Sequence, residues 1–305
     1  MTTDTDQHTT VALAPRSEGA NIRTWIGFKH FMYLAEEAVL NWFQDRGHGA
    51  ATLFRRHGLG LTIVDSSVLL PAVLESDDVV DAQVTGGPPR FTVRLLARRA
   101  GRPTVLRGRI TVALVAQPGV AGAEPPPAVL APLVTATVGG LAAEERHDRP
   151  AAGGSAADVL APPGSSAFLW SWRVPYFYCQ FSDGIQHSGY VRAMEEVVDR
   201  FLADRGLSVA SMLRGRGWIP VVSRARIRML ADVAMEETMH TVFVVDDVIK
   251  GVSFDARMDC YVHRGETFTH VATGRILHGY AVARGQGAGS LAVLDRATID
   301  ALIAG

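Results

Sequence analysis

The chain has 305 residues, of which 48% are hydrophobic, and its 30 Lys and Arg nearly balance its 31 Asp and Glu. This length predicts roughly two domains of ordinary size, each with its own core. The balanced charge excludes a whole-molecule field that would attract nucleic acid or an anionic membrane, so any phosphate-binding role must be local.

The cysteines and the N-terminal segment indicate the compartment. Cys179 and Cys260 form no CxxC spacing, so neither a disulfide framework nor a Cys-based zinc site is expected. Residues 1–20 are polar and lack the features of a secretory signal, and we expect a disordered leader in a cytoplasmic protein. The uncharged stretch 125–143 contains prolines and paired glycines, which a membrane-spanning helix would not tolerate.

The first predicted unit covers residues 21–117. A short extended segment at 21–28 precedes a helix at 31–47, whose apolar residues recur at spacings of three and four. Alternating or continuous apolar runs separated by turn-forming sequences then predict four strands, at 61–74, 79–85, 91–100 and 104–116.

The second predicted unit covers residues 167–284 and follows a Pro-, Gly- and Ala-rich linker at 118–166. An extended aromatic segment leads into a helix at 189–206. Four strands follow, at 219–230, 235–248, 252–264 and 269–283. Residues 285–305 are expected to form a tail that ends in a helix.

The two helices align without a gap at an offset of 159 residues. EEAVLNWFQDRG at 36–47 and EEVVDRFLADRG at 195–206 are identical at six of twelve positions. The same order of elements surrounds each helix, so the pattern predicts a duplicated fold.

The segment 181–197 resembles hotdog-fold thioesterases. QHSGYVRAMEEV is similar to the H-G-G-(x)5-A-(x)-D/E pattern that enters the central helix of many of them, and FSD is similar to the F-x-D of the hydroxybenzoyl-CoA type. The loop between Asp183 and the helix is shorter than in that type. The resemblance implies an α+β fold of two hotdog units in tandem, each a long central helix wrapped by an antiparallel sheet. It also implies an acyl thioesterase acting on acyl-CoA or an acyl carrier protein.

The same segment supplies candidate catalytic groups. Free backbone N–H groups around Gly189 and Tyr190 at the helix N-terminus would stabilise an oxyanion, and Gly189 would let the carbonyl approach. Asp183 or Glu196 would serve as general base or nucleophile, because Glu196 follows His187 at the spacing of the family's catalytic acid.

Other residues are weaker candidates. Glu195 would project about 100° away from Glu196 on the helix. Asp183 could instead cap a turn, and His187 could only hydrogen-bond the backbone at the helix entry.

The first unit carries an incomplete copy of this set. His30, Glu36 and Glu37 echo it, but no Asp precedes His30 and no Gly follows it. We therefore expect one working site and one degenerate half that supplies walls, with Tyr33, Glu37 and Asp65 contributing to substrate binding across the interface.

Arg224, Arg226 and Arg228 alternate along one predicted strand and therefore share a face. They would bind the phosphates of coenzyme A or of a carrier protein's phosphopantetheine, or they would form a solvated outer face. Neither a metal nor any cofactor apart from this part of the substrate is expected. The expected partners are an acyl thioester or an acyl carrier protein, with a homo-oligomer possible.

Three functions remain open at this point. Hydrolysis of a thioester is the first. A hydratase, dehydratase or conjugate-addition enzyme acting on an α,β-unsaturated acyl thioester is the second, with Asp183 and His187 moving protons. A non-catalytic acyl-binding protein is the third. The chain lacks a Gly-rich phosphate loop, HExxH and G-x-S-x-G, which argues against nucleotide, zincin and serine-hydrolase chemistry.

Overall fold

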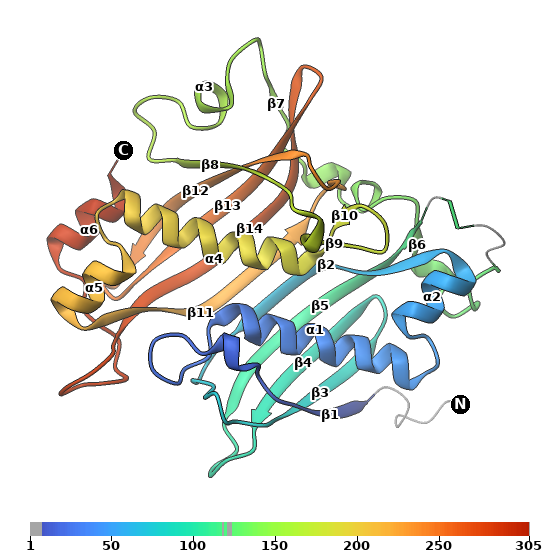
Figure 1. Cartoon of the computed structure of the whole chain (residues 1–305), viewed down its shortest axis with the longest axis horizontal. Coiled ribbons are helices and arrows are strands. Elements are labelled where there is room, and N and C mark those ends of the chain that lie inside the picture. Colours follow the sequence, from blue (N-terminus) through green and yellow to red (C-terminus); the bar gives the residue numbers. More distant parts are fainter. Residues whose placement is uncertain (1–7, 118, 121–123, 305) are drawn as a thin grey trace.

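The computed structural model describes residues 8–117, 119–120 and 124–304, so the first seven residues of the expected leader lie outside it. One antiparallel sheet runs through both halves of the chain in the order β1-β3-β4-β5-β2-β11-β14-β13-β12-β8. Two long helices, α1 (Phe28–Asp45) and α4 (His187–Asp204), lie side by side across one face of this sheet (Figure 1). The α+β prediction is confirmed.

The first half supplies five neighbouring strands and two helices. The strands are β1 (Thr9–Leu13), β2 (Leu59–Leu69), β3 (Val80–Gly87), β4 (Arg90–Ala97) and β5 (Thr104–Ala116). Helix α1 buries Phe31, Ala38 and Phe43 against them, as its apolar spacing predicts. A second helix, α2 (Ala50–His57), ends at Gly58, whose left-handed backbone favours glycine.

The second half repeats this order. Its strands are β8 (Phe168–Arg173), β11 (Trp218–Met229), β12 (Thr238–Ile249), β13 (Ser253–Arg264) and β14 (Thr267–Val282). The short pair β9 (Cys179–Gln180) and β10 (Gly184–Ile185) precedes α4, and α5 (Val209–Arg216) follows it. The two halves join where β11 pairs antiparallel with β2, which places Ile227 opposite Ser66.

The offset of 159 residues holds in the structure as well as in the sequence. Helix α4 begins 159 residues after α1, and α5 begins 159 residues after α2. Backbone hydrogen bonds repeat at the same offset. Ile26 N donates to Leu74 O (2.9 Å), and the equivalent Ile185 N donates to Val233 O (2.8 Å).

The structure corrects three expectations. Part of the expected leader is ordered, because β1 pairs with β3 as the edge strand of the sheet and buries Thr9. Residues 21–28 form no continuous strand before α1, only isolated bridges at Ala20–Ile26 and Trp25–Glu75. The sequence analysis also missed α2 and α5, which are only eight residues long and contain few buried positions.

The expected linker is largely folded onto the sheet. β6 (Val134–Thr135) pairs with β5, β7 (Arg149–Pro150) pairs with β14, and the Ser155 side chain caps α3 (Ala156–Leu160). The tail ends in α6 (Arg296–Ile303), as expected. Short 3-10 helices are η2 (Ser17–Gly19), η3 (Ala131–Leu133), η4 (Gly139–Leu141), η5 (Ala143–Glu145) and η6 (Tyr176–Tyr178).

Within the described residues, no helix combines the length and the apolar character that crossing a membrane requires.

Candidate active site between the two halves

Two cavities occupy equivalent places in the two halves. The larger, of about 1160 Å³, lies at the start of α1 and is also lined by α4 and β11. The smaller, of about 470 Å³, lies at the segment before α4 and is also lined by β2 and the end of β5. Residues that lie 159 positions apart line the two cavities. Ile26 and Leu70 line the larger one, and their counterparts Ile185 and Met229 line the smaller one. Each cavity therefore takes walls from both halves.

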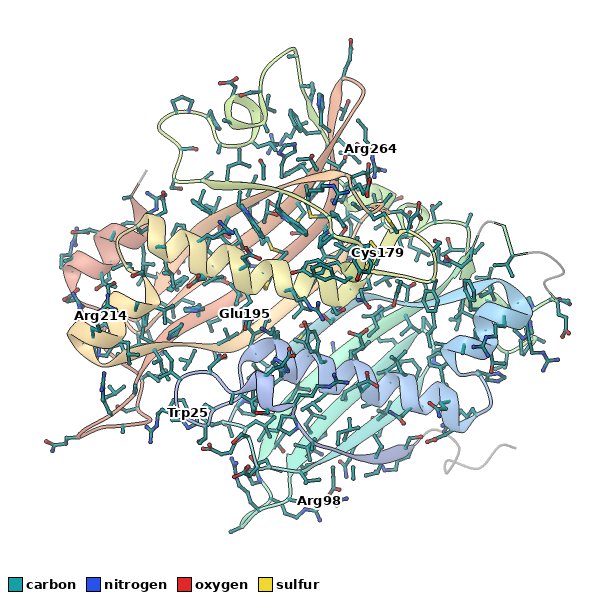
Figure 2. The ribbon with its side chains drawn as sticks, viewed as in Figure 1. Trp25, Arg98, Cys179, Glu195, Arg214 and Arg264 are labelled. Atoms are coloured by element: carbon teal, nitrogen blue, oxygen red, sulfur yellow. The ribbon has the colours of Figure 1, made fainter. Side chains whose placement is uncertain are left out.

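The larger cavity has mainly apolar walls and exceeds the usual size of a ligand pocket. Its apolar lining comes from the start of α1 and the segment before it, from the residue after β2, and from α4, β11 and β14. It includes Ile22, Trp25, Ile26, Phe28, Leu70, Val198, Leu202, Ile219 and Ile276. Figure 2 shows Trp25 in the segment that leads to α1. Exposed Val73 and Leu291 also line it, so the cavity reaches solvent there. Such a space suits a long hydrocarbon chain.

Acidic side chains of α4 line the same cavity, and one of them, Glu195, contacts the first turn of α1. Glu195 lies on the side of α4 that faces α1 (Figure 2), and its Oε2 is 2.6 Å from Lys29 Nζ. Glu196 Oε1 accepts hydrogen bonds from Arg200 Nη2 (2.7 Å) and Nε (2.9 Å), whereas no hydrogen bond is recorded to its Oε2 within the described chain. One oxygen of Glu196 is therefore available to a ligand.

Arg192 fixes the contact between the two helices. Its Nε donates to the Tyr33 hydroxyl (2.7 Å), and its guanidinium lies over the rings of Tyr33 and Tyr178, 5.6 and 5.2 Å from their centroids. Burial raises the pKa of Tyr33. Arg192 and Tyr178 line the larger cavity but Tyr33 does not, so Tyr33 reaches that cavity only through Arg192.

Asp183 and Glu196 do not share a site, because Asp183 lines the smaller cavity and Glu196 the larger. Asp183 is exposed, its Oδ1 accepts a hydrogen bond from Ser182 Oγ (3.3 Å), and its backbone oxygen accepts one from Met235 N (2.7 Å). The two predicted carboxylates therefore lie in separate cavities. Each cavity also contains other acidic side chains, namely Glu18, Glu195 and Asp199 in the larger and Asp232 and Glu237 in the smaller.

His187 is buried at the start of α4 and lines neither cavity. Its Nε2 lies 2.8 Å from the Ser66 hydroxyl of β2, across the junction of the halves. Burial lowers its pKa to about 4, so the ring is neutral near pH 7. The structure therefore does not bring His187 and Asp183 together at one cavity surface.

Gly189 and Tyr190 face protein rather than open space. Gly189 N donates to Gln186 O (2.9 Å), and a Cβ on Gly189 would lie 2.9 Å from Ile185 Cγ1 and 3.3 Å from Tyr178 Cβ. The Tyr190 side chain is fully buried, and burial raises its pKa well above the ordinary value. Their predicted roles in binding the carbonyl remain predictions.

The acidic pair of the first half also lies away from both cavities. Glu37 is exposed, and neither Glu36 nor Glu37 lines a cavity. Burial, and then the neighbouring Glu37, raise the pKa of Glu36 to about 7. His30 is buried with its Nε2 3.8 Å from Glu18 Oε1.

The three arginines of β11 share the sheet face opposite the helices, because the intervening Ala225 and Ile227 are buried in the core. Arg226 pairs with Asp65 (2.8 Å), and Arg228 pairs with Glu145. Arg224 is exposed. None of the three lines a described cavity, so their predicted contact with substrate phosphates stays untested.

Comparison with known proteins identifies the fold. No family model and no curated protein matches the sequence. A Lactobacillus plantarum structure provisionally assigned as an oleoyl thioesterase has a TM-score of 0.59 at 12% identity, covering 89% of this chain and 96% of that one. The 12:0-ACP thioesterase of Umbellularia californica has a TM-score of 0.58 at 11% identity, covering 90% and 97%. An acyl-ACP thioesterase from Bacteroides thetaiotaomicron has a TM-score of 0.54 at 11% identity, covering 91% and 100%.

The fold is that of the hotdog thioesterases. The match extends over most of the chain, which agrees with the resemblance inferred from residues 181–197.

Sequence reasoning missed several residues of the larger cavity. Lys29 and Arg192 belong to no recognised motif, and they reach the cavity only because the two helices lie side by side. The offset of 159 was the sequence signal that could have pointed to α4. It makes Arg192 the counterpart of Tyr33, and Glu195 the counterpart of Glu36. Within the described ranges, no three His, Cys, Asp or Glu side chains are grouped as a metal site would require.

Proposed function

We propose that the chain consists of two hotdog units in tandem and hydrolyses an acyl thioester, of coenzyme A or a carrier protein, in the larger cavity. The helices, the left-handed glycine caps Gly58 and Gly217, and the backbone hydrogen bonds all repeat at the offset of 159 and support two units. The acyl-ACP thioesterases among the similar structures support a thioester substrate.

One observation carries the reaction: a large apolar cavity holds both an available carboxylate and the first turn of a helix. The apolar walls accept the acyl chain, and Glu196 Oε2 is free to hydrogen-bond a water molecule. Phe28 and Lys29 line the cavity in the first turn of α1, where backbone N–H groups have no helical acceptor and the helix dipole is positive.

The proposed reaction follows from these groups. Glu196 takes a proton from water as the oxygen attacks the thioester carbonyl carbon. The N–H groups at the start of α1 stabilise the negative charge on the carbonyl oxygen. The intermediate then breaks its C–S bond, and the departing thiolate takes up the proton to leave a thiol and a carboxylic acid.

Variants of the two predicted carboxylates test the site. Glu196→Gln is expected to lower kcat for release of thiol from saturated acyl thioesters by about 100-fold or more, because it removes the base. Glu195→Gln is the matched control, since Glu195 pairs with Lys29, and we expect a loss of less than about 10-fold. Asp183→Asn should retain near-normal turnover.

The opposite result would move the reaction to the smaller cavity, with Asp183→Asn inactive and Glu196→Gln active. The same panel separates the competing reactions. A change in enoyl absorbance of 2-enoyl thioesters without thiol release would favour addition or elimination instead, and binding without either signal would favour a non-catalytic protein.

A further inference from the structure

His278 is an unpaired polar side chain in the wall of the larger cavity. It lies on β14 opposite Val222 of β11, and both residues line the cavity. The side chain is only 3% exposed, and its Nδ1 has no hydrogen-bond partner. The rings of Phe254 and Tyr280 pack at 4.9 and 6.0 Å between centroids, and the Tyr280 hydroxyl is not bonded to it.

An imidazole in this position is costly. Burying a polar group without a partner is unfavourable, and burial lowers the pKa of His278 to about 3, so the ring is neutral. A neutral imidazole carries one N–H donor and one acceptor nitrogen. The Nδ1 atom is fully enclosed by protein, so a ligand in the cavity can reach only Nε2, and a plain hydrocarbon chain would leave Nε2 unsatisfied.

The fold itself does not require a histidine here. In the first half, the residue opposite Ile63 of β2 is Val112 of β5, and this pair is equivalent to Val222 and His278. One nitrogen is also unbonded in the buried imidazoles of His30, His187 and His270. Each of those rings nevertheless has a polar group nearby, namely the Ser66 hydroxyl at His187 and carboxylates 3.8 Å from His30 and 3.4 Å from His270. His278 is thus a polar exception at a position that can be apolar.

We infer that the larger cavity selects an oxygenated acyl chain, whose hydroxyl or oxo oxygen hydrogen-bonds the His278 imidazole. This inference rests on the proposed acyl-binding role of the cavity. A hydroxyl can both donate and accept, so it satisfies either tautomer, whereas an oxo group accepts from the N–H. Discrimination arises because a chain without the oxygen leaves a buried polar group unpaired.

Direct binding of free acids tests the inference without turnover. Isothermal titration at pH 7 would compare dodecanoic acid with its positional hydroxy isomers on the full chain. We expect at least one hydroxy isomer to bind about 10-fold more tightly than dodecanoic acid. His278→Leu should abolish this preference, and His278→Gln should retain part of it.

Tyr280→Phe is the matched control, because it removes another buried, unpaired polar group of β14 that does not line the cavity. It should leave the preference unchanged. Preference of the wild type for dodecanoic acid, or an unchanged hydroxy preference in both His278 variants, would overturn the inference.

The outcomes also separate the inference from the proposed hydrolysis. Thiol release without any hydroxy preference would leave the hydrolase proposal standing and refute the role of His278. A preference for hydroxy acids without thiol release would support the role of His278 and refute the proposed hydrolysis. Absence of binding by every acid would refute the inference, because the cavity would then not be an acyl site.

Discussion

Replacing His187 with Gln should make the protein less sensitive to acid. The folded state holds the imidazole neutral with a pKa of about 4, whereas in the unfolded chain the ring has its ordinary pKa of 6.5. Below pH 6.5 the unfolded chain therefore binds a proton that the folded chain does not, and stability falls as pH falls towards 4. At pH 4.5 this costs the wild type about 2 to 3 kcal/mol, at 1.36 kcal/mol per pKa unit.

The assay is urea unfolding of wild type and variant at pH 7.5 and 4.5. At pH 7.5 we expect His187→Gln to be less stable by about 1 kcal/mol, because the contact with Ser66 is altered. At pH 4.5 the difference should shift by about 2 to 3 kcal/mol in favour of the variant. Ser66→Ala keeps the imidazole and should retain the wild-type pH dependence. A difference between His187→Gln and wild type that stays constant across this range would refute the reasoning.

Two further substitutions examine residues near the candidate site. Gly189→Ala should lower the free energy of unfolding by about 1 kcal/mol, because the clash with Ile185 outweighs the gain in helix propensity. The control is Gly215→Ala, which should stabilise the protein because a Cβ there would meet no atom within 4 Å. Equal effects of the two substitutions would contradict this prediction. Arg224→Ala should change KM for acyl thioesters by less than about two-fold in steady-state assays, because Arg224 lies on the sheet face opposite the helices. An increase in KM above about ten-fold would instead support the predicted role of Arg224 in binding substrate phosphates.

The main helices and strands were predictable because their patterns are local. The apolar spacing of α1 and α4 and the alternation along β11 are visible in short windows, and β5 has the predicted bounds 104–116. The offset of 159 in the sequence also predicted that the order of elements repeats. By contrast, β1 is stabilised by pairing with β3, which begins 71 residues later in the chain (9 to 80), and its own sequence does not show this pairing.

The site was harder to predict because it depends on how the halves meet. His187 and Glu196 are nine residues apart, which corresponds to about 13.5 Å along a helix. The sequence could not show that the two side chains have different surroundings. The pairing of β2 with β11 places the first turn of α1 near Glu195. Likewise, Gly189 suggested an open approach, whereas Ile185 and Tyr178 fill the space beside it.

The most direct test of the acyl site is a crystal structure with a non-hydrolysable acyl thioester analogue, in which a methylene group separates the carbonyl from sulfur. We expect the acyl chain within the larger cavity, with its carbonyl near the first turn of α1 and the Glu196 carboxylate. A chain bound in the smaller cavity, with its carbonyl against Asp183, would contradict the account.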